Sequence, residues 1–188
     1  MKIIICILVT FTLLMGSSSA EEENKLLFMT ATEIAKLIKE KKITSVEVVT
    51  KVNSQIQKYN ANYNAIVTLN TNALADAKKA DEMLAQGRIL GPLHGVPIVI
   101  KDSFKVQGLR TTAGYLPLKD FIPDEDALVV KLLKDAGAII IGKGNLPTLA
   151  MDMQTDNPIF GRTNNPWDTS RTSGGSTGGD SGSVASGF

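Results

Sequence analysis

Apolar residues recur at helical spacing soon after position 30, and each of two such stretches begins with a capping box. Thr30 precedes Glu33 by three positions in the first box, and Thr44 precedes Glu47 in the second. In this motif the Thr hydroxyl and the Glu carboxylate accept hydrogen bonds from free N–H groups of the first turn. The apolar positions behind the boxes are Ile34, Leu37 and Ile38, then Val48, Val49, Val52, Ile56 and Tyr59. The pattern predicts two short helices, the second ending at residues 60–62.

Short apolar runs farther along the chain have the composition of buried strands. Runs rich in β-branched residues lie at 65–69, 97–101 and 138–142. Helical patterns separate them, and residues 102–123 show little periodicity and are predicted to be a long loop. This order predicts an α/β fold in which helices flank a mixed or parallel sheet.

Two further helices are predicted between these strands. One covers residues 71–86, with Asn70 as its cap and Gly87 after its end. The other begins at the acidic residues 124–126, which the helix dipole favours at an N-terminus. Its predicted buried stripe is Ala127, Val130, Leu132 and Leu133.

Regular patterns fade after residue 143. Residues 146–153 are predicted to form a short helix, and residues 156–183 are dominated by Asn, Pro, Gly, Ser and Thr. A glycine- and serine-dense run at 174–187 has the composition of a catalytic loop. A disordered linker is the alternative, although Phe160 and Trp167 make it the weaker one.

The first twenty residues have the pattern of a secretory signal peptide. Lys2 precedes an apolar run at 3–15, small residues follow at 16–20, and Glu21 comes next. We expect cleavage after Ala20 and a secreted or periplasmic protein without a stable membrane span; an uncleaved N-terminal anchor is the alternative. Cleavage would also remove Cys6, the single cysteine of the sequence. The predicted organisation is a signal peptide at 1–20 and one partial domain at 21–188.

Composition and charge narrow the function classes. The 188 residues are 43% hydrophobic and 21% charged, with a formal net charge of +1 and 5% aromatic residues. A balanced charge and few aromatic residues predict no nucleic-acid or anionic membrane partner.

Two segments carry candidate chemistry. Lys101 ends the apolar run at 97–100, and a lysine drawn into an apolar site can have its pKa lowered enough to act as a base. Residues 174–179 place the hydroxyls of Ser176 and Thr177 among four glycines. This run lacks the Gly-Lys-Ser/Thr ending of a phosphate-binding loop, so a nucleotide site is disfavoured.

The remaining polar residues support neither a metal nor a cofactor. His94 is the single histidine, so a Ser-His-Asp triad would have to use it. The acids Asp152, Asp156 and Asp180 show no metal-ligand spacing with a histidine. We therefore expect no metal and no cofactor.

Three segments in this order resemble the amidase signature family, whose members hydrolyse carbon–nitrogen amide bonds. They are residues 93–102, residues 137–145, and residues 160–167 running into the Gly-Gly-Ser-Thr-Gly-Gly run. The resemblance implies a mixed sheet flanked by helices, with this chain as the N-terminal part of a larger domain. His94 would then be a structural neighbour of the lysine strand.

The resemblance also implies a Lys-Ser-Ser relay. Lys101 matches the catalytic lysine, and Ser176 matches the bridging serine, which in the family lies beside a non-proline cis peptide bond. The nucleophilic serine would lie after Phe188; it attacks the amide carbonyl and forms an acyl-enzyme that water hydrolyses. Thr177 stands where many members have a second serine. The implied substrate is a small-molecule or peptide amide, with no cofactor.

Two alternatives stay open at this point. The chain could be a non-catalytic fragment or pseudoenzyme that kept the scaffold without the nucleophile. It could also resemble the glutaminase subunit of a glutamine-dependent amidotransferase, which works in the cytoplasm with partner subunits and transfer RNA. The predicted signal peptide disfavours this second alternative. The particular substrate and the oligomeric state are not predicted.

Overall fold

A mixed sheet of three strands lies at the centre of the computed structural model, which describes residues 25–188. The strands are β1 (Ile66–Leu69), β2 (Pro97–Lys101) and β3 (Ile139–Gly144), in the order β1-β3-β2. The central strand β3 runs antiparallel to β1 and parallel to β2. The predicted α/β fold with a mixed sheet is therefore confirmed, whereas the predicted signal peptide at 1–20 lies outside the described residues.

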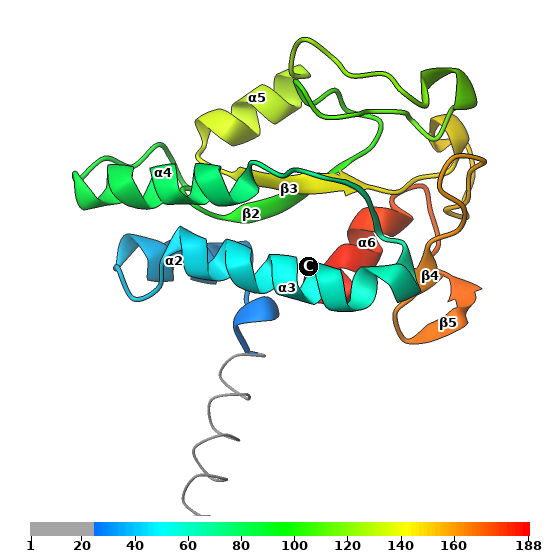
Figure 1. Ribbon diagram of the computed structural model, residues 1–188. Coiled ribbons are helices and arrows are strands. Elements are labelled where there is room, and N and C mark those ends of the chain that lie inside the picture. The colour runs from blue at the N-terminus through cyan, green and yellow to red at the C-terminus, as the bar shows by residue number, and fades with distance from the viewer. Residues whose placement is uncertain (1–24) are drawn as a thin grey trace, which may run out of the picture.

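Helices cover both faces of this sheet (Figure 1). On one face lie α2 (Ala31–Lys39), α3 (Ser45–Tyr63), α4 (Ala73–Ala85) and α6 (Gly178–Ala185). On the other face lie α5 (Leu128–Asp135) and the long loop that follows β2. Two 3₁₀ turns, η1 (Leu116–Leu118) and η2 (Thr148–Ala150), and a small hairpin of β4 (Asn164–Asn165) and β5 (Asp168–Thr172) complete the structure.

The core forms because every residue of β3 is buried between these two layers. Ile139 and Ile141 pack into the larger cluster with α2, α3 and α4, whereas Ile140 packs with Val130 of α5. Alternation along a strand sends successive side chains to opposite faces, so one short apolar strand serves both clusters.

Both predicted capping boxes are confirmed, but the second helix is longer than predicted. The hydroxyls of Thr30 and Thr44 accept from the backbone N–H of Glu33 and Glu47, and both carboxylates accept from the backbone N–H of the capping threonine. Helix α3 continues through Asn60 to Tyr63, where Asn64 adopts a left-handed conformation.

The helix does not end at Asn60 because that side chain bonds to the strand that follows. Its Oδ1 accepts from the backbone N–H groups of Ala65 and Ile66, and its Nδ2 donates to the carbonyl of Ile66. The asparagine therefore connects α3 to β1 and does not terminate the helix.

The predicted starts of α4 and α5 are wrong for a related reason. Asn70 bonds to the carbonyl of Ile140 in β3, and the N-cap position of α4 is Asn72. Helix α5 begins at Leu128, after the acidic residues 124–126. Asp126 instead accepts from the backbone N–H of Gln107 and pairs with Lys134 at 2.8 Å, so it connects the loop to the helix.

The other predicted features of α5 and of the following segment also need correction. Leu132 is 58% exposed, whereas Val130 is completely buried. The helix predicted at 146–153 is reduced to η2, because Leu149 and Ala150 both have positive φ. The predicted loop at 156–183 contains the β4–β5 hairpin and the first part of α6.

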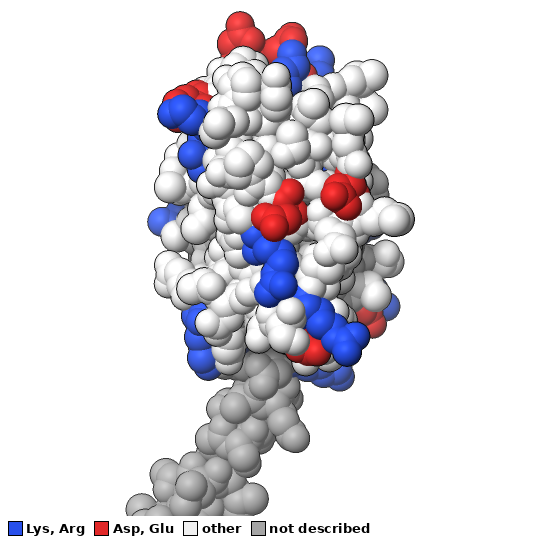
Figure 2. Space-filling view, turned by 90° about the vertical axis from the view of Figure 1, so that its right-hand side faces the viewer, with Lys and Arg blue, Asp and Glu red and all other residues white. Residues whose placement is uncertain are grey.

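The face that carries the hairpin is largely uncharged, with basic side chains gathered beside acidic ones near its middle (Figure 2). Between residues 25 and 188, the chain has no helix of the length and apolar character needed to cross a membrane.

Candidate active site

The two predicted site residues, Lys101 and Ser176, meet although 75 positions separate them. Lys101 is the last residue of β2, and its Nζ donates to the Oγ of Ser176 at 2.7 Å. It also lies 3.0 Å from the Oγ1 of Thr177, the residue before α6. The peptide bond between Gly175 and Ser176 is cis, as the resemblance implies.

Glycines bring this segment close to the end of β3. The N–H of Gly179 donates to the carbonyl of Asn145 at 3.0 Å, and a Cβ at Gly179 would lie 2.0 Å from the Asn145 nitrogen. A Cβ at Gly178 would lie 2.2 Å from the Oγ1 of Thr155. This oxygen accepts a hydrogen bond from the backbone N–H of Gly178. Only residues without a side chain allow this approach, and the approach places Ser176 beside Lys101.

The electrostatics of the site depend on its partial burial. Lys101 and Ser176 are half-buried, while Thr177 is exposed. Burial lowers the pKa of Lys101 below its ordinary value, and the carboxylate of Asp180 in α6 opposes this effect. A lowered pKa brings the lysine nearer to the neutral form that a base requires.

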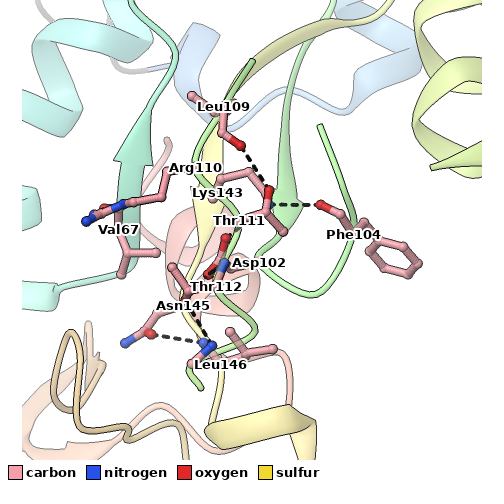
Figure 3. A network of polar contacts seen from close by, with 11 residues as sticks. Val67, Asp102, Phe104, Leu109, Arg110, Thr111, Thr112, Lys143, Asn145 and Leu146 are labelled. Carbon is pink, nitrogen blue, oxygen red and sulfur yellow. Dashed lines mark hydrogen bonds and ion pairs between the residues drawn. The ribbon is translucent and has the colours of Figure 1, made fainter. Parts of the chain in front are cut away.

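A second lysine, Lys143 of β3, lies in a closed polar network on the loop face of the sheet (Figure 3). Its Nζ donates to Asp102 at 3.0 Å, to the Phe104 carbonyl at 2.9 Å and to the Oγ1 of Thr111 at 2.7 Å. The side chains of Lys143 and Asp102 are completely buried. The second carboxylate oxygen of Asp102 accepts from the backbone and the hydroxyl of Thr112.

Asn145 organises the segment behind α6. Its Nδ2 donates to the carbonyl of Gly161 and to the hydroxyl of Thr163, and its Oδ1 accepts from the side chain of Asn157. All of these bonds join residues that are distant in sequence. They fix the segment against which the Gly178–Gly179 pair packs.

His94 is not part of this site. It is buried, and its ring nitrogens contact the carbonyl of Ala80 at 3.0 Å and the N–H of Leu90 at 3.3 Å. Its contacts are therefore with backbone groups, as expected for a structural histidine. Over the part of the chain that the structure describes, no three His, Cys, Asp or Glu residues are grouped so that they could hold a metal ion.

Sequence reasoning misses Asp180, Lys143 and Asn145 as parts of the site. A usable signal exists for Lys143, a lysine that follows four apolar or glycine positions in a buried strand. A lysine is almost never fully buried without a partner, so its presence there predicts a carboxylate opposite. Neither Asp180 nor Asn145 carries such a signal, because their positions depend on the packing of α6.

The structure brings Lys101 and Ser176 together at the edge of a mixed α/β sheet, and comparisons with known proteins assign the chain to a family. The sequence profile described as Amidase matches residues 47–188. In Carboxydothermus hydrogenoformans, the A subunit of glutamyl-tRNA(Gln) amidotransferase is 43% identical over 164 residues, covering 87% of this chain and 34% of that protein. The corresponding protein of Heliobacterium modesticaldum is 42% identical, with the same coverage.

Solved structures agree with the sequence matches. A fatty acid amide hydrolase has a TM-score of 0.83 at 28% identity, over 88% of this chain and 30% of that one. The peptide amidase of Stenotrophomonas maltophilia has a TM-score of 0.74 at 29% identity, over 80% of this chain and 32% of that one. The chain therefore belongs to the amidase signature family, and it spans about a third of the length of the curated relatives it matches. The family supports an enzyme of the carbon–nitrogen hydrolase or amidotransferase kind.

Proposed function

We propose that this chain supplies the lysine–serine part of the proton relay in an amide-cleaving enzyme of the amidase signature family. The observation that carries the proposal is the 2.7 Å contact between Lys101 and Ser176. Proton transfer requires heavy atoms at about 2.6–3.2 Å, and this pair lies within that range.

In the proposed relay, neutral Lys101 is the base. The hydroxyl of Ser176 gives its proton to the Nζ of Lys101 and takes a proton from the nucleophilic hydroxyl. The nucleophile then attacks the amide carbonyl, and the relay runs in reverse to protonate the leaving nitrogen. The resemblance assigns the nucleophile to a serine in sequence after position 188, so the complete reaction is proposed for a chain that includes such a segment.

We favour the side-chain carboxamide of glutamine as the amide that is cleaved. The support is the 40–43% identity to amidotransferase subunits over 83–87% of this chain. In an amidotransferase of this kind, ammonia released from glutamine is passed to the acceptor, here a glutamyl-tRNA bound with partner subunits. This proposal replaces the simple hydrolase that the sequence analysis favoured.

A stand-alone amide hydrolase is the second candidate, and the N-terminal sequence favours it. The charged residue, apolar run and small residues at 1–20 are typical of an exported protein. Export after cleavage at Ala20 would separate the protein from cytoplasmic tRNA. The identity to stand-alone amidases of known structure, 28–32%, supports the same chemistry on other amides.

The test uses the complete product of the gene, purified from its source. Ammonia release from L-glutamine and cleavage of an aryl amide are measured for the wild type, Lys101→Ala and Ser176→Ala. We expect each substitution to reduce kcat/KM by about 10²–10⁴-fold, the usual contribution of a positioned acid–base group. Lys131→Ala is the control, because Lys131 is an exposed lysine on α5.

The outcomes separate the candidates. Preferential turnover of glutamine supports the amidotransferase subunit, and preferential turnover of the aryl amide supports the hydrolase. Full activity in Lys101→Ala and Ser176→Ala would refute the relay. A wild type that cleaves neither amide would favour the non-catalytic alternative.

A further inference from the structure

The carboxylate of Asp180 is buried without a hydrogen-bond partner, next to the strand that ends at Lys101. Over the described part of the chain, neither of its oxygens has a hydrogen-bond partner in another residue. Asp180 lies in the first turn of α6, on the face of the sheet where Lys101 meets Ser176. A buried carboxylate with no partner is costly, so its retention calls for an explanation.

The carboxylate occupies the space above Gly144. A Cβ at Gly144 would lie 2.3 Å from the Oδ1 of Asp180 and 2.8 Å from its Cγ. Gly144 is the register partner of Lys101 across the β2–β3 pair. The glycine therefore makes room for a carboxylate beside the lysine of the relay.

The charged groups that act on Asp180 come from two strands and the loop. Burial raises the pKa of Asp180 to about 6, the charges of Lys101 and Lys143 oppose this rise, and Asp102 adds to it. Lys143 and Asp102 form an ion pair at 3.0 Å, so their effects on a third group largely cancel. Lys101, whose Nζ is hydrogen-bonded to the hydroxyls of Ser176 and Thr177, is the cation left to balance Asp180.

We propose that Asp180 is a positioning residue of the Lys101–Ser176 relay, whose negative charge sets the pH at which Lys101 becomes a neutral base. This inference rests on the proposed function, because it assigns a role within the same relay. The carboxylate stabilises the ammonium form of Lys101 and thereby opposes the effect of burial on that lysine. Its removal makes the neutral lysine available at lower pH.

The test compares the wild type with Asp180→Asn in the complete gene product, through the pH dependence of kcat/KM. We expect the acidic limb of the pH profile, where kcat/KM rises with pH, to move to lower pH. At a given pH on this limb, kcat/KM should be raised on the order of tenfold. Asp76→Asn is the matched control, because it removes an exposed first-turn aspartate from α4. That variant should leave the limb unchanged.

A second readout does not depend on activity. NMR of ¹³C-labelled lysines follows the titration of Lys101 directly in the 188-residue chain, with Lys101→Arg used to assign its signal. We expect the midpoint of Lys101 to fall in Asp180→Asn and to stay in place in Asp76→Asn. If the asparagine variant does not fold, Asp180→Ser gives the same loss of charge with a smaller side chain.

The two readouts distinguish the failure of this inference from that of the proposed function. A lowered Lys101 midpoint without any amide cleavage would refute the amidase proposal and retain the coupling between Asp180 and Lys101. A midpoint and an acidic limb that both stay unchanged would overturn the inference. A midpoint that rises would overturn it as well, because the sign is fixed by the charge of the carboxylate.

Discussion

Replacing Lys143 by methionine should strongly destabilise the protein. The ammonium group uses all three of its hydrogens, on Asp102, the Phe104 carbonyl and Thr111, at 2.7–3.0 Å. Methionine fills a similar volume but supplies no charge and no donor. The carboxylate of Asp102, which is completely buried, would then have no opposite charge at ion-pair distance among the described residues.

The magnitude follows from the cost of an uncompensated buried charge. Removing one partner of a buried ion pair costs about 3–5 kcal/mol, more than the hydrogen bonds alone would. For a chain of about 150–250 residues, each kcal/mol lowers Tm by about 2–4 °C. We therefore expect Lys143→Met to lower Tm by roughly 6–20 °C at neutral pH.

The assays are thermal unfolding, which gives Tm, and urea unfolding, which gives the unfolding free energy, both on the 188-residue chain and followed by far-UV circular dichroism. Lys131→Met is the control for loss of a lysine, because Lys131 is exposed, and it should change the unfolding free energy by less than about 0.5 kcal/mol. Adding Asp102→Asn to Lys143→Met should restore part of the stability, since it removes the unpaired charge. A loss below about 1 kcal/mol in Lys143→Met, or a double variant less stable than the single one, would refute this reasoning.

Three further predictions concern the glycine pair, a helix cap and the pH dependence of stability. Gly179→Ala should destabilise by about 1–3 kcal/mol or more in urea unfolding, because its Cβ would lie 2.0 Å from a backbone nitrogen; an unchanged midpoint would contradict the packing. Thr44→Ala should cost about 1 kcal/mol through loss of the α3 cap, measured in the same way. Thr71→Ala is the control, because Thr71 is an exposed threonine that precedes the N-cap residue of α4. Burial raises the pKa of Asp180 from 3.8 to about 6, so the folded state holds that proton more tightly and stability should fall as pH rises through this window. Asp180→Asn should therefore be more stable than the wild type at about pH 7 and equal to it below pH 3.8; an equal difference at both pH values would exclude the linkage.

The parts of the fold that local chemistry controls can be predicted from the sequence. The capping boxes at Thr30 and Thr44 are recognisable because each involves residues three positions apart. The strands β2 and β3 are recognisable from their apolar, β-branched composition. The expected burial is confirmed for β3 at every position, whereas in β2, which lies beside β3 at one side of the sheet, Ile100 is buried and the other residues are half-buried. These signals lie within a few positions of each other, so no knowledge of packing is needed.

Helix α6 could not be predicted, because its sequence opposes helix formation. Gly178, Gly179 and Gly182 each cost about 1 kcal/mol relative to alanine in a helix. The helix forms there because tertiary contacts require close approach, as the Gly179–Asn145 bond shows. The acidic residues before α5 give the opposite error, because they predict a helix start that is not there. Asp126 accepts a hydrogen bond from the loop residue Gln107 and does not lie in the first turn of the helix.

In the candidate site, too, some residues can be predicted from the sequence and others only from the folded structure. The resemblance supplies Lys101 and Ser176, but it gives no means to place Asp180 beside them. That placement depends on the register of β2 against β3, which shifts between Ile98 and Val99. A shift of one residue turns a side chain to the other face of a sheet, so the neighbours of Lys101 follow only from the folded structure.

The contrast between the two lysines explains why one of them suits a relay and the other does not. Lys143 donates to a carboxylate, to a carbonyl and to the hydroxyl of Thr111, which gives its own hydrogen to the carbonyl of Leu109. These three acceptors need all three hydrogens of the ammonium form. The hydrogen bonds of Lys101 go to the hydroxyls of Ser176 and Thr177, and a hydroxyl can donate as well as accept. When Lys101 loses its proton, the hydroxyl of Ser176 can turn and donate to the neutral nitrogen, so the contact survives in both charge states. A carboxylate placed at this distance in place of Ser176 would hold the lysine permanently charged, whereas Asp180, which makes no hydrogen bond to it, biases the charge and leaves it free to change.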